Sequence, residues 1–316
     1  MKELDAVHVD YIHIDCNDDP SAIDHIKQIR SMSTTAIDLH VISATPEVFY
    51  TGIKDTNVDL VTFQYENLAS LLVFPADIKA KLGLAIVSET LIDVFEAYKD
   101  RFDFVLFMTT TPGQSGGTFN ADNFKRIRMF KAKYPDKKIH VDGGVTDEVA
   151  FVLRNLGVDC IVSGSYLVNA NDTVGRALHR LKNDVFTSHT KVSDFMLTLE
   201  ETPIVNPLAT FLEILQCIEK YNLGFAAVAD PAGHLMGIIS NADLRRGLMK
   251  NIHQLNSISV SELVNKEPYT IKLSNNVSEM INFIKNIKAT ILFLPVVDEK
   301  NILQGVVTFN NLIKGE

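Results

Sequence analysis

Histidine and aspartate side chains recur near the ends of apolar, β-branched segments in the first half of this chain. The run Tyr11-Ile12-His13-Ile14-Asp15-Cys16 alternates, so a strand here would place His13 and Asp15 on the same face. Later segments close with Asp38-Leu39-His40 and with Val141-Asp142-Gly143-Gly144. Two histidines and two carboxylates can hold a divalent ion, so this pattern predicts a metal site.

The elements that must position these side chains alternate between residue 11 and about residue 182. Short β-branched segments predict strands, at 11–16, 36–42, 59–64, 82–87, 103–108, 138–141 and 159–163. Segments with apolar residues every three or four positions predict helices between them, such as 21–31, 91–98, 121–133 and 147–156. This alternation predicts a parallel sheet, either open or closed into a barrel.

The distribution of polar residues favours an α/β barrel of the TIM type, because barrel enzymes carry their sites where the strands end. Seven strands are predicted, whereas a closed barrel usually has about eight. Residues 1–10 do not predict a strand with a crossover helix. A lost first strand, a start further upstream or a different closure would each account for the count.

Two glycine turns follow the last two predicted strands, Asp142-Gly143-Gly144 and Ser163-Gly164-Ser165. Glycine lets backbone N–H groups approach an anion, and the helix after each turn directs its positive end toward it. Tight turns of this kind need glycine in any case. We nevertheless expect a phosphate cradle formed by Gly143, Gly144, Gly164 and Ser165.

A third loop, residues 110–119, contains more glycine than a connector requires, at Gly113, Gly116 and Gly117. Such a loop either closes over a ligand or forms a surface turn.

Residues 8–182 resemble the ribulose-phosphate 3-epimerases. The resemblance rests on five motifs in consistent order: Val9-Asp10-Tyr11-Ile12-His13-Ile14-Asp15, Ile37-Asp38-Leu39-His40, a Met-x-x-x-Pro-Gly-x-x-Gly-x-x-Phe loop at 108–119, Val141-Asp142-Gly143-Gly144-Val145, and the glycine-containing segment 157–165. It implies that the divalent metal ligands are His13, Asp15, His40 and Asp142. Mixed nitrogen and oxygen ligands suit zinc, iron(II), manganese or cobalt.

The resemblance also implies that Asp15 and Asp142 are the two acid/base groups. Inverting a carbon next to a ketone removes a proton from one face and returns one to the other, so two carboxylates must flank the substrate. A metal would stabilise the enediolate between the two steps. We expect an epimerase acting on a ketose phosphate of the ribulose 5-phosphate/xylulose 5-phosphate type.

The chain departs from the family in three places, one of which is Asn17-Asp18-Asp19, where the family usually has Met-Asp-Gly. The family's first strand, with its substrate-contacting serine, is absent, and Gln64-Tyr65-Glu66 stands where the family has His-x-Glu. Glu66 is expected to be a surface or helix-start carboxylate. These departures favour an alternative function, a sensor that binds a sugar phosphate without turnover, whereas the complete acid pair and metal set favour the enzyme.

Past residue 182 a polar connector, 184–190, precedes an internal repeat of about 60 residues. The matching segments are 192–196 with 260–264, 225–230 with 292–298, and 237–244 with 305–312. The unit resembles a CBS domain, and the pair is most similar to those appended to sugar-phosphate isomerases. The expected organisation is a barrel at 1–183, a linker at 184–190 and α+β CBS domains at 191–251 and 258–316.

The CBS resemblance implies an adenosine nucleotide site, because that family's Gly-x-x-Ser/Thr-x-x-Asp turn contacts such nucleotides. Ser240 and Asp243 fit the motif, whereas the second copy has Thr308 and Asn311, and an amide is a weaker acceptor for ribose hydroxyls. One occupied site is therefore expected rather than two. Alternatively, the pair only dimerises.

Bulk composition limits the partners. With 30 basic and 39 acidic residues the net charge is -9, which argues against nucleic-acid or anionic-membrane surfaces. The three cysteines, Cys16, Cys160 and Cys217, lie singly in apolar segments, so no disulfide framework is indicated. No apolar run approaches about 18 residues and the first residues lack a signal-peptide core. We expect a cytoplasmic homo-oligomer with a sugar-phosphate substrate.

Overall fold

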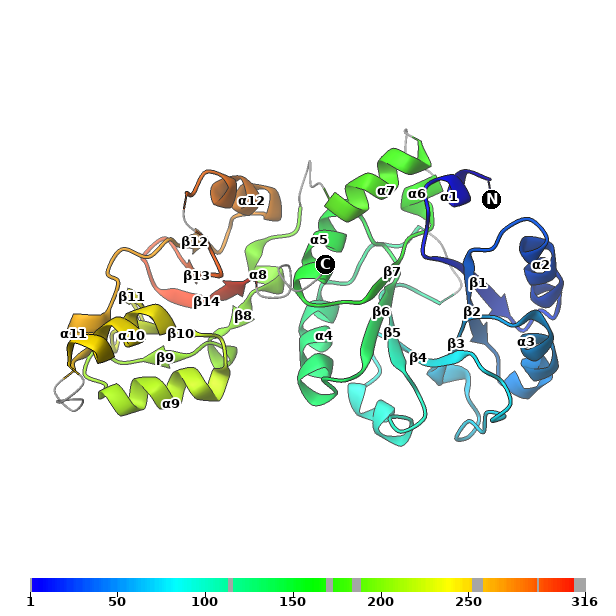
Figure 1. The fold of residues 1–316 in the computed structure, drawn as a ribbon, viewed down its shortest axis with the longest axis horizontal. Coiled ribbons are helices and arrows are strands. Elements are labelled where there is room, and N and C mark those ends of the chain that lie inside the picture. The colour runs from blue at the N-terminus through cyan, green and yellow to red at the C-terminus, as the bar shows by residue number, and fades with distance from the viewer. Residues whose placement is uncertain are drawn as a thin grey trace. The chain divides into compact units, whose positions relative to one another are not determined.

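The computed structural model describes residues 2–112, 116–168, 173–183, 189–251, 258–288 and 290–309 (Figure 1). The chain divides into two compact units, Met1–Val185 and Phe186–Glu316. Among the described residues, no helix has both the length and the apolar character required to cross a bilayer.

The first unit contains a single seven-stranded sheet in which every neighbouring pair is parallel and the strands lie in chain order. Its strands are β1 (Tyr11–Asn17), β2 (Ala36–Ile42), β3 (Leu60–Gln64), β4 (Lys81–Val87), β5 (Phe104–Met108), β6 (Lys138–Asp142) and β7 (Cys160–Val162). The sheet curves into a nearly closed barrel of the TIM type, which confirms the predicted fold class (Figure 1).

Helices connect these strands and pack on the sheet. The α-helices are α1 (Lys2–Ala6), α2 (Ser21–Arg30), α3 (Tyr50–Thr56), α4 (Asp122–Lys133), α5 (Asp147–Asn155), α6 (Ser165–Val168) and α7 (Val174–Asn183). Three 3-10 helices are η1 (Pro46–Phe49), η2 (Tyr65–Asn67) and η3 (Ile92–Ala97). The helix predicted at 91–98 is thus a 3-10 helix, and it turns Phe95 into the core.

Burial within the sheet falls from its centre to its edges. Every residue of β3 and β5 is buried, whereas all three residues of β7 and most of β1 remain partly exposed. In the described part of the chain, β1 pairs only with β2 and β7 only with β6. The barrel is therefore not closed by hydrogen bonds between its first and last strands.

Three aspartates clamp the amino ends of neighbouring strands. Asp59, Asp103 and Asp159 each stand immediately before a strand. Each donates its backbone N–H to a carbonyl of the preceding strand and accepts that same residue's N–H on its carboxylate. The three carboxylate distances are 2.8 Å to Ile37 N, 2.9 Å to Leu82 N and 2.9 Å to Ile139 N. These aspartate clamps set the register of the sheet at the end opposite the predicted site.

The second unit contains two small sheets, ordered β11-β10-β9 and β12-β13-β14-β8. Its strands are β8 (Leu197–Thr198), β9 (Ile204–Val205), β10 (Phe225–Ala229), β11 (Leu235–Ser240), β12 (Ile271–Lys272), β13 (Phe293–Val297) and β14 (Leu303–Thr308). Its helices are α8 (Val192–Phe195), η4 (Leu199–Glu201), α9 (Phe211–Tyr221), α10 (Asn241–Lys250), α11 (Val260–Leu263) and α12 (Val277–Lys285). The antiparallel pairs β10–β11 and β13–β14 share the same bulge position, which matches the internal repeat.

Candidate metal and acid–base site

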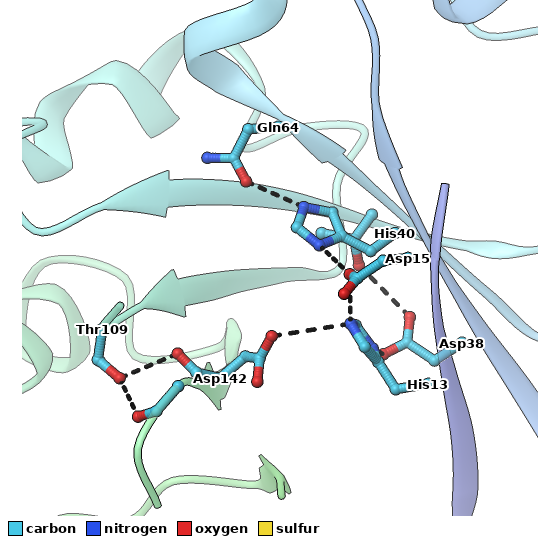
Figure 2. Close-up of polar contacts among 9 residues, drawn as sticks. His13, Asp15, Asp38, His40, Gln64, Thr109 and Asp142 are labelled. Atoms are coloured by element: carbon cyan, nitrogen blue, oxygen red, sulfur yellow. Dashed lines mark hydrogen bonds and ion pairs between the residues drawn. The ribbon is translucent and has the colours of Figure 1, made fainter. Parts of the chain in front are cut away.

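Strand alternation brings His13, Asp15 and His40 into one cluster, and Asp142 approaches this cluster through His13 (Figure 2). His13 and Asp15 lie on β1, and the register of the sheet places Asp15 beside His40 of β2. Asp142 is the last residue of β6. His40 is buried and the His13 side chain is 13% exposed, whereas the side chains of Asp15 and Asp142 keep 36% and 19% exposure. A substrate arriving from solvent therefore meets the carboxylates first.

His13 uses one ring nitrogen within the sheet and leaves the other for the site. Its Nδ1 lies 2.8 Å from Asp38 Oδ2, and Asp38 is 1% exposed. Its Nε2 lies 3.4 Å from Asp15 Oδ1 and 3.9 Å from Asp142 Oδ2, and this buried atom has no hydrogen-bond partner among the described residues. The sequence prediction assigned no role to Asp38. Its position two residues before His40, on the same strand face, is the signal that could have indicated one.

In His40 the two ring nitrogens have the opposite roles: Nδ1 faces the site, and Nε2 contacts a partner in the sheet. Its Nδ1 lies 3.1 Å from Asp15 Oδ1, and its Nε2 lies 2.9 Å from Gln64 Oε1 (Figure 2). Gln64 in turn donates to Glu66, whose other carboxylate oxygen accepts from Val87 N and Thr90 Oγ1. Glu66 is exposed and lies in η2, as expected of a helix-start carboxylate, and it also holds the Gln64 amide.

Two observations indicate that His13, Asp15 and His40 fit a divalent metal. A buried imidazole nitrogen without a partner, such as His13 Nε2, is costly unless it binds a ligand. Metal–ligand bonds of about 2.0–2.2 Å at ordinary coordination angles place ligand atoms about 3.0–3.5 Å apart. The separations from Asp15 Oδ1 to His40 Nδ1 and to His13 Nε2, 3.1 and 3.4 Å, lie in that range. Ligand atoms of these three residues all lie within 4.8 Å of one another.

The carboxylates and imidazoles shift one another's proton affinities. Burial lowers the pKa of His13, but the carboxylates of Asp15 and Asp38 outweigh burial and raise it to about 10. Burial raises the pKa of Asp15, but His13 and His40 outweigh it and hold that pKa well below its usual range. Asp142 differs, because burial dominates and raises its pKa. Positive charge on His13 would favour the ionised form of the carboxylates around it.

The turn after β6 is locked to the loop after β5. The Thr109 hydroxyl donates to the carbonyl oxygens of Asp142, at 2.9 Å, and of Gly143. Gly144 adopts φ +63°, and a Cβ there would lie 2.3 Å from Phe119 N and 2.8 Å from Gly117 O. Close packing therefore requires glycine at this position independently of any ligand. The contribution of Thr109 had no signal in the sequence.

The turn after β7 is different, because a Cβ on Gly164 would meet no atom of the described residues within 4 Å. Ser163 Oγ donates to Val145 O at 3.2 Å and so ties this turn to the segment after Gly144. Ser165 begins the short helix α6. Of the predicted loop glycines, Gly116 and Gly117 lie in the described part of the 109–119 loop, whereas Gly113 lies outside the described residues.

The predicted nucleotide residues begin helix α10 of the second unit. The Ser240 hydroxyl accepts from Asp243 N at 3.3 Å, and the Asp243 carboxylate accepts from Ser240 N at 2.9 Å, so the two residues form a capping box. The guanidinium of Arg246 also donates to Asp243. In the second copy Thr308 ends β14, and Asn311 lies outside the described residues.

Comparisons with known proteins cover both units. Residues 1–168 match the model of the ribulose-phosphate 3 epimerase family, and residues 192–250 and 260–315 match that of the CBS domain. Ribulose-phosphate 3-epimerase from Schizosaccharomyces pombe is 24% identical over 51% of this chain and 76% of the relative. The enzyme of the same name from Candida glabrata is 30% identical over 44% of this chain and 58% of the relative.

Among solved structures, the CBS-pair protein CBSX2 from Arabidopsis thaliana is 24% identical, with a TM-score of 0.34, over 39% of this chain and 92% of that protein.

The epimerase match covers more than half of the chain and contains every strand of the barrel. It also contains Asp15 and Asp142, whose carboxylates approach His13 Nε2. The chain therefore belongs to the ribulose-phosphate 3-epimerase family, and two CBS domains follow its barrel.

Proposed function

We propose that the first unit is a metal-dependent epimerase that inverts the carbon next to the ketone of a ketose phosphate. The observation that carries the proposal is the convergence of two carboxylates from distant strands, β1 and β6, on the single buried nitrogen His13 Nε2. A protein that only binds a sugar phosphate needs no such pair, whereas two-face proton transfer does.

The two carboxylates divide the proton transfers. One takes the proton from one face of the substrate carbon, and the other returns a proton to the opposite face. Asp15 and Asp142 reach the site from two separate strands, so a substrate between them has one on each side. Asp38 positions His13, and Thr109 fixes the backbone of Asp142.

The residues that would hold the metal are His13, Asp15, His40 and Asp142. When bound, zinc, iron(II), manganese or cobalt supplies a Lewis acid for the negative charge that develops between the two proton transfers.

The substrate phosphate would bind at the turns after β6 and β7. Support comes from Gly164, because packing does not require a glycine there and open space adjoins it. Gly143 and Gly144 would contribute from the neighbouring turn, together with Ser165 at the start of α6. The described loop residues Gly116 and Gly117 would border the same ligand.

A solvent-exchange assay tests the proposal. Purified protein supplied with Mn²⁺ or Zn²⁺ is incubated with ribulose 5-phosphate in D₂O, and the products are followed by NMR. We expect xylulose 5-phosphate with deuterium at the inverted carbon. Substrate that stays unlabelled with every metal tested, while the protein binds that metal, would refute the epimerase.

A second candidate is a non-catalytic sugar-phosphate sensor. It is favoured by the outer edges of β1 and β7, which pair with no other strand among the described residues, and by Gln64 in place of the family's histidine. The same experiment separates the two, because a sensor binds ribulose 5-phosphate without incorporating deuterium.

For the second unit we propose that the CBS domains, taken as 191–251 and 258–316, bind one adenosine nucleotide at Ser240 and Asp243. The capping box presents a hydroxyl and a carboxylate at the start of α10, where ribose hydroxyls and a phosphate can both find partners. We further propose that the protein is a cytoplasmic homo-oligomer.

A further inference from the structure

His40 Nε2 has a defined neighbour deep in the barrel. His40 is 0% exposed and Gln64 is 1% exposed, so water does not compete for the 2.9 Å contact between His40 Nε2 and Gln64 Oε1. Which atom carries the proton depends on which way the Gln64 amide points.

The surroundings of the amide determine its direction. The Gln64 nitrogen faces the Glu66 carboxylate and, at 3.5 Å, the carbonyl oxygen of Ala85. Both neighbours only accept hydrogen bonds, so the NH₂ group must lie on their side and the carbonyl must face the histidine. A carbonyl cannot donate. His40 Nε2 must therefore carry the proton.

The position of this proton determines the role of the other ring nitrogen, Nδ1. With Nε2 holding its proton against Gln64, Nδ1 is the ring nitrogen that can give up a proton and offer a lone pair to a metal, which Asp15 Oδ1, 3.1 Å away, could bind as well. His13 is arranged in the mirror sense, because Asp38 occupies its Nδ1 and leaves Nε2 for the site. The two candidate ligands thus use different ring atoms, and each is selected by its neighbour.

We propose that Gln64 is a positioning residue for the metal, whose amide keeps the proton of His40 on Nε2 and so makes Nδ1 the ligand atom. The proposal rests on the metal site of the proposed function. It also accounts for the departure from His-x-Glu: an imidazole at position 64 can present either a proton or a lone pair to His40, whereas the amide held by Glu66 and Ala85 presents only an acceptor.

Two variants separate this role from simple packing. Gln64→Leu keeps the approximate volume but removes the acceptor. The double variant Gln64→Glu/Glu66→Gln restores an acceptor facing His40 at unchanged net charge, because the new amide at 66 can donate to the new carboxylate at 64. Gln28→Leu is the matched control, since Gln28 lies on the exposed face of α2.

The measurements are Zn²⁺ affinity by calorimetry and ¹⁵N NMR of the histidine rings in the zinc-loaded, full-length protein. We expect Gln64→Leu to weaken zinc binding roughly 10- to 100-fold, as loss of a partner of a ligating histidine does. The double variant should bind within about threefold of the wild type. The wild-type spectrum should show His40 protonated at Nε2.

Wild-type affinity in Gln64→Leu would overturn the proposal, as would a proton on His40 Nδ1 in the wild type. A loss in Gln64→Leu that the folded double variant does not recover would also overturn it, because packing alone would then explain the effect. Wild-type protein that binds zinc but fails to epimerise would defeat the proposed function and leave this inference standing.

Discussion

Each histidine of the site keeps one ring nitrogen for a partner in the sheet and turns the other toward carboxylates. Asp38 and Gln64 are therefore as important to the arrangement as the ligands they orient. Neither residue contacts solvent to any extent. At the residue scale, the site consists of pairs, each made of a histidine and the side chain that orients it. The effect of a substitution should therefore be interpreted together with its partner.

Replacing Asp15 or Asp142 with Asn should reduce solvent exchange at the inverted carbon by at least ~10²-fold, because each change removes a proton carrier but keeps the shape. Deuterium incorporation by NMR measures the effect. Asp24→Asn, an exposed position on α2, is the control. A wild-type exchange rate in either site variant would refute the two-base mechanism.

The two glycine turns should respond differently to alanine. Gly164→Ala adds a methyl group to open space, so thermal stability should not change while KM for the sugar phosphate rises. Gly144→Ala should destabilise the barrel by about 1–3 kcal/mol because of its positive φ, with the close approach of Phe119 N adding to the loss. Calorimetry and steady-state kinetics test both, and unchanged KM in Gly164→Ala would remove that residue from the phosphate site.

At the scale of elements, the aspartate clamps explain a small difference between prediction and structure. The short β-branched segments predicted strands starting at residues 59, 103 and 159, but the strands begin one residue later. In each case the aspartate pairs through its side chain as well as its backbone, so it ends the ladder rather than extending it. Local periodicity locates strands well because the inward and outward pattern is a property of a few consecutive residues.

Part of the candidate site could also be predicted from the sequence. His13, Asp15, His40 and Asp142 could be identified because their positions follow from strand ends and family motifs. The orientation of the Gln64 amide could not, because it depends on Ala85, a residue of another strand. The role of Thr109 depends likewise on a carbonyl 33 residues away. Partners of this kind are determined by the packed barrel and leave no local pattern.

Asp103→Ala should lower the free energy of unfolding by about 0.5–1.5 kcal/mol, the usual contribution of one hydrogen bond, because Leu82 N loses its acceptor. Asp103→Asn retains a side-chain oxygen and should lose less. Urea denaturation of both variants measures the difference. Equal stability of the alanine variant and the wild type would show that the clamp contributes only to register.

At the scale of the whole molecule, the effect of a ligand on stability can be assigned to one of the two units. An adenosine nucleotide at one hundred times its dissociation constant should stabilise the second unit by about 2.7 kcal/mol. Thermal scans with AMP, ADP, ATP and S-adenosylmethionine would reveal it. Asp243→Ala should abolish the ligand-induced increment, and its own melting temperature should fall because the carboxylate caps α10. No increment with any of the four ligands would leave the pair as a dimerisation module.

The open seam between β1 and β7 gives the barrel the character of a linear array, in which each strand is tied mainly to its sequence neighbours. The metal ligands do not follow that order: three come from β1 and β2, at one end of the array, and the fourth from β6, near the other. A metal ion bound by these residues would link β1 and β2 to β6, and so close the barrel that hydrogen bonds between the described strands leave open. Much of the free energy of metal binding would then offset the loss of chain entropy on closing the ring. Hydrogen exchange in β1 should therefore slow on metal addition far more than exchange in the fully buried β3.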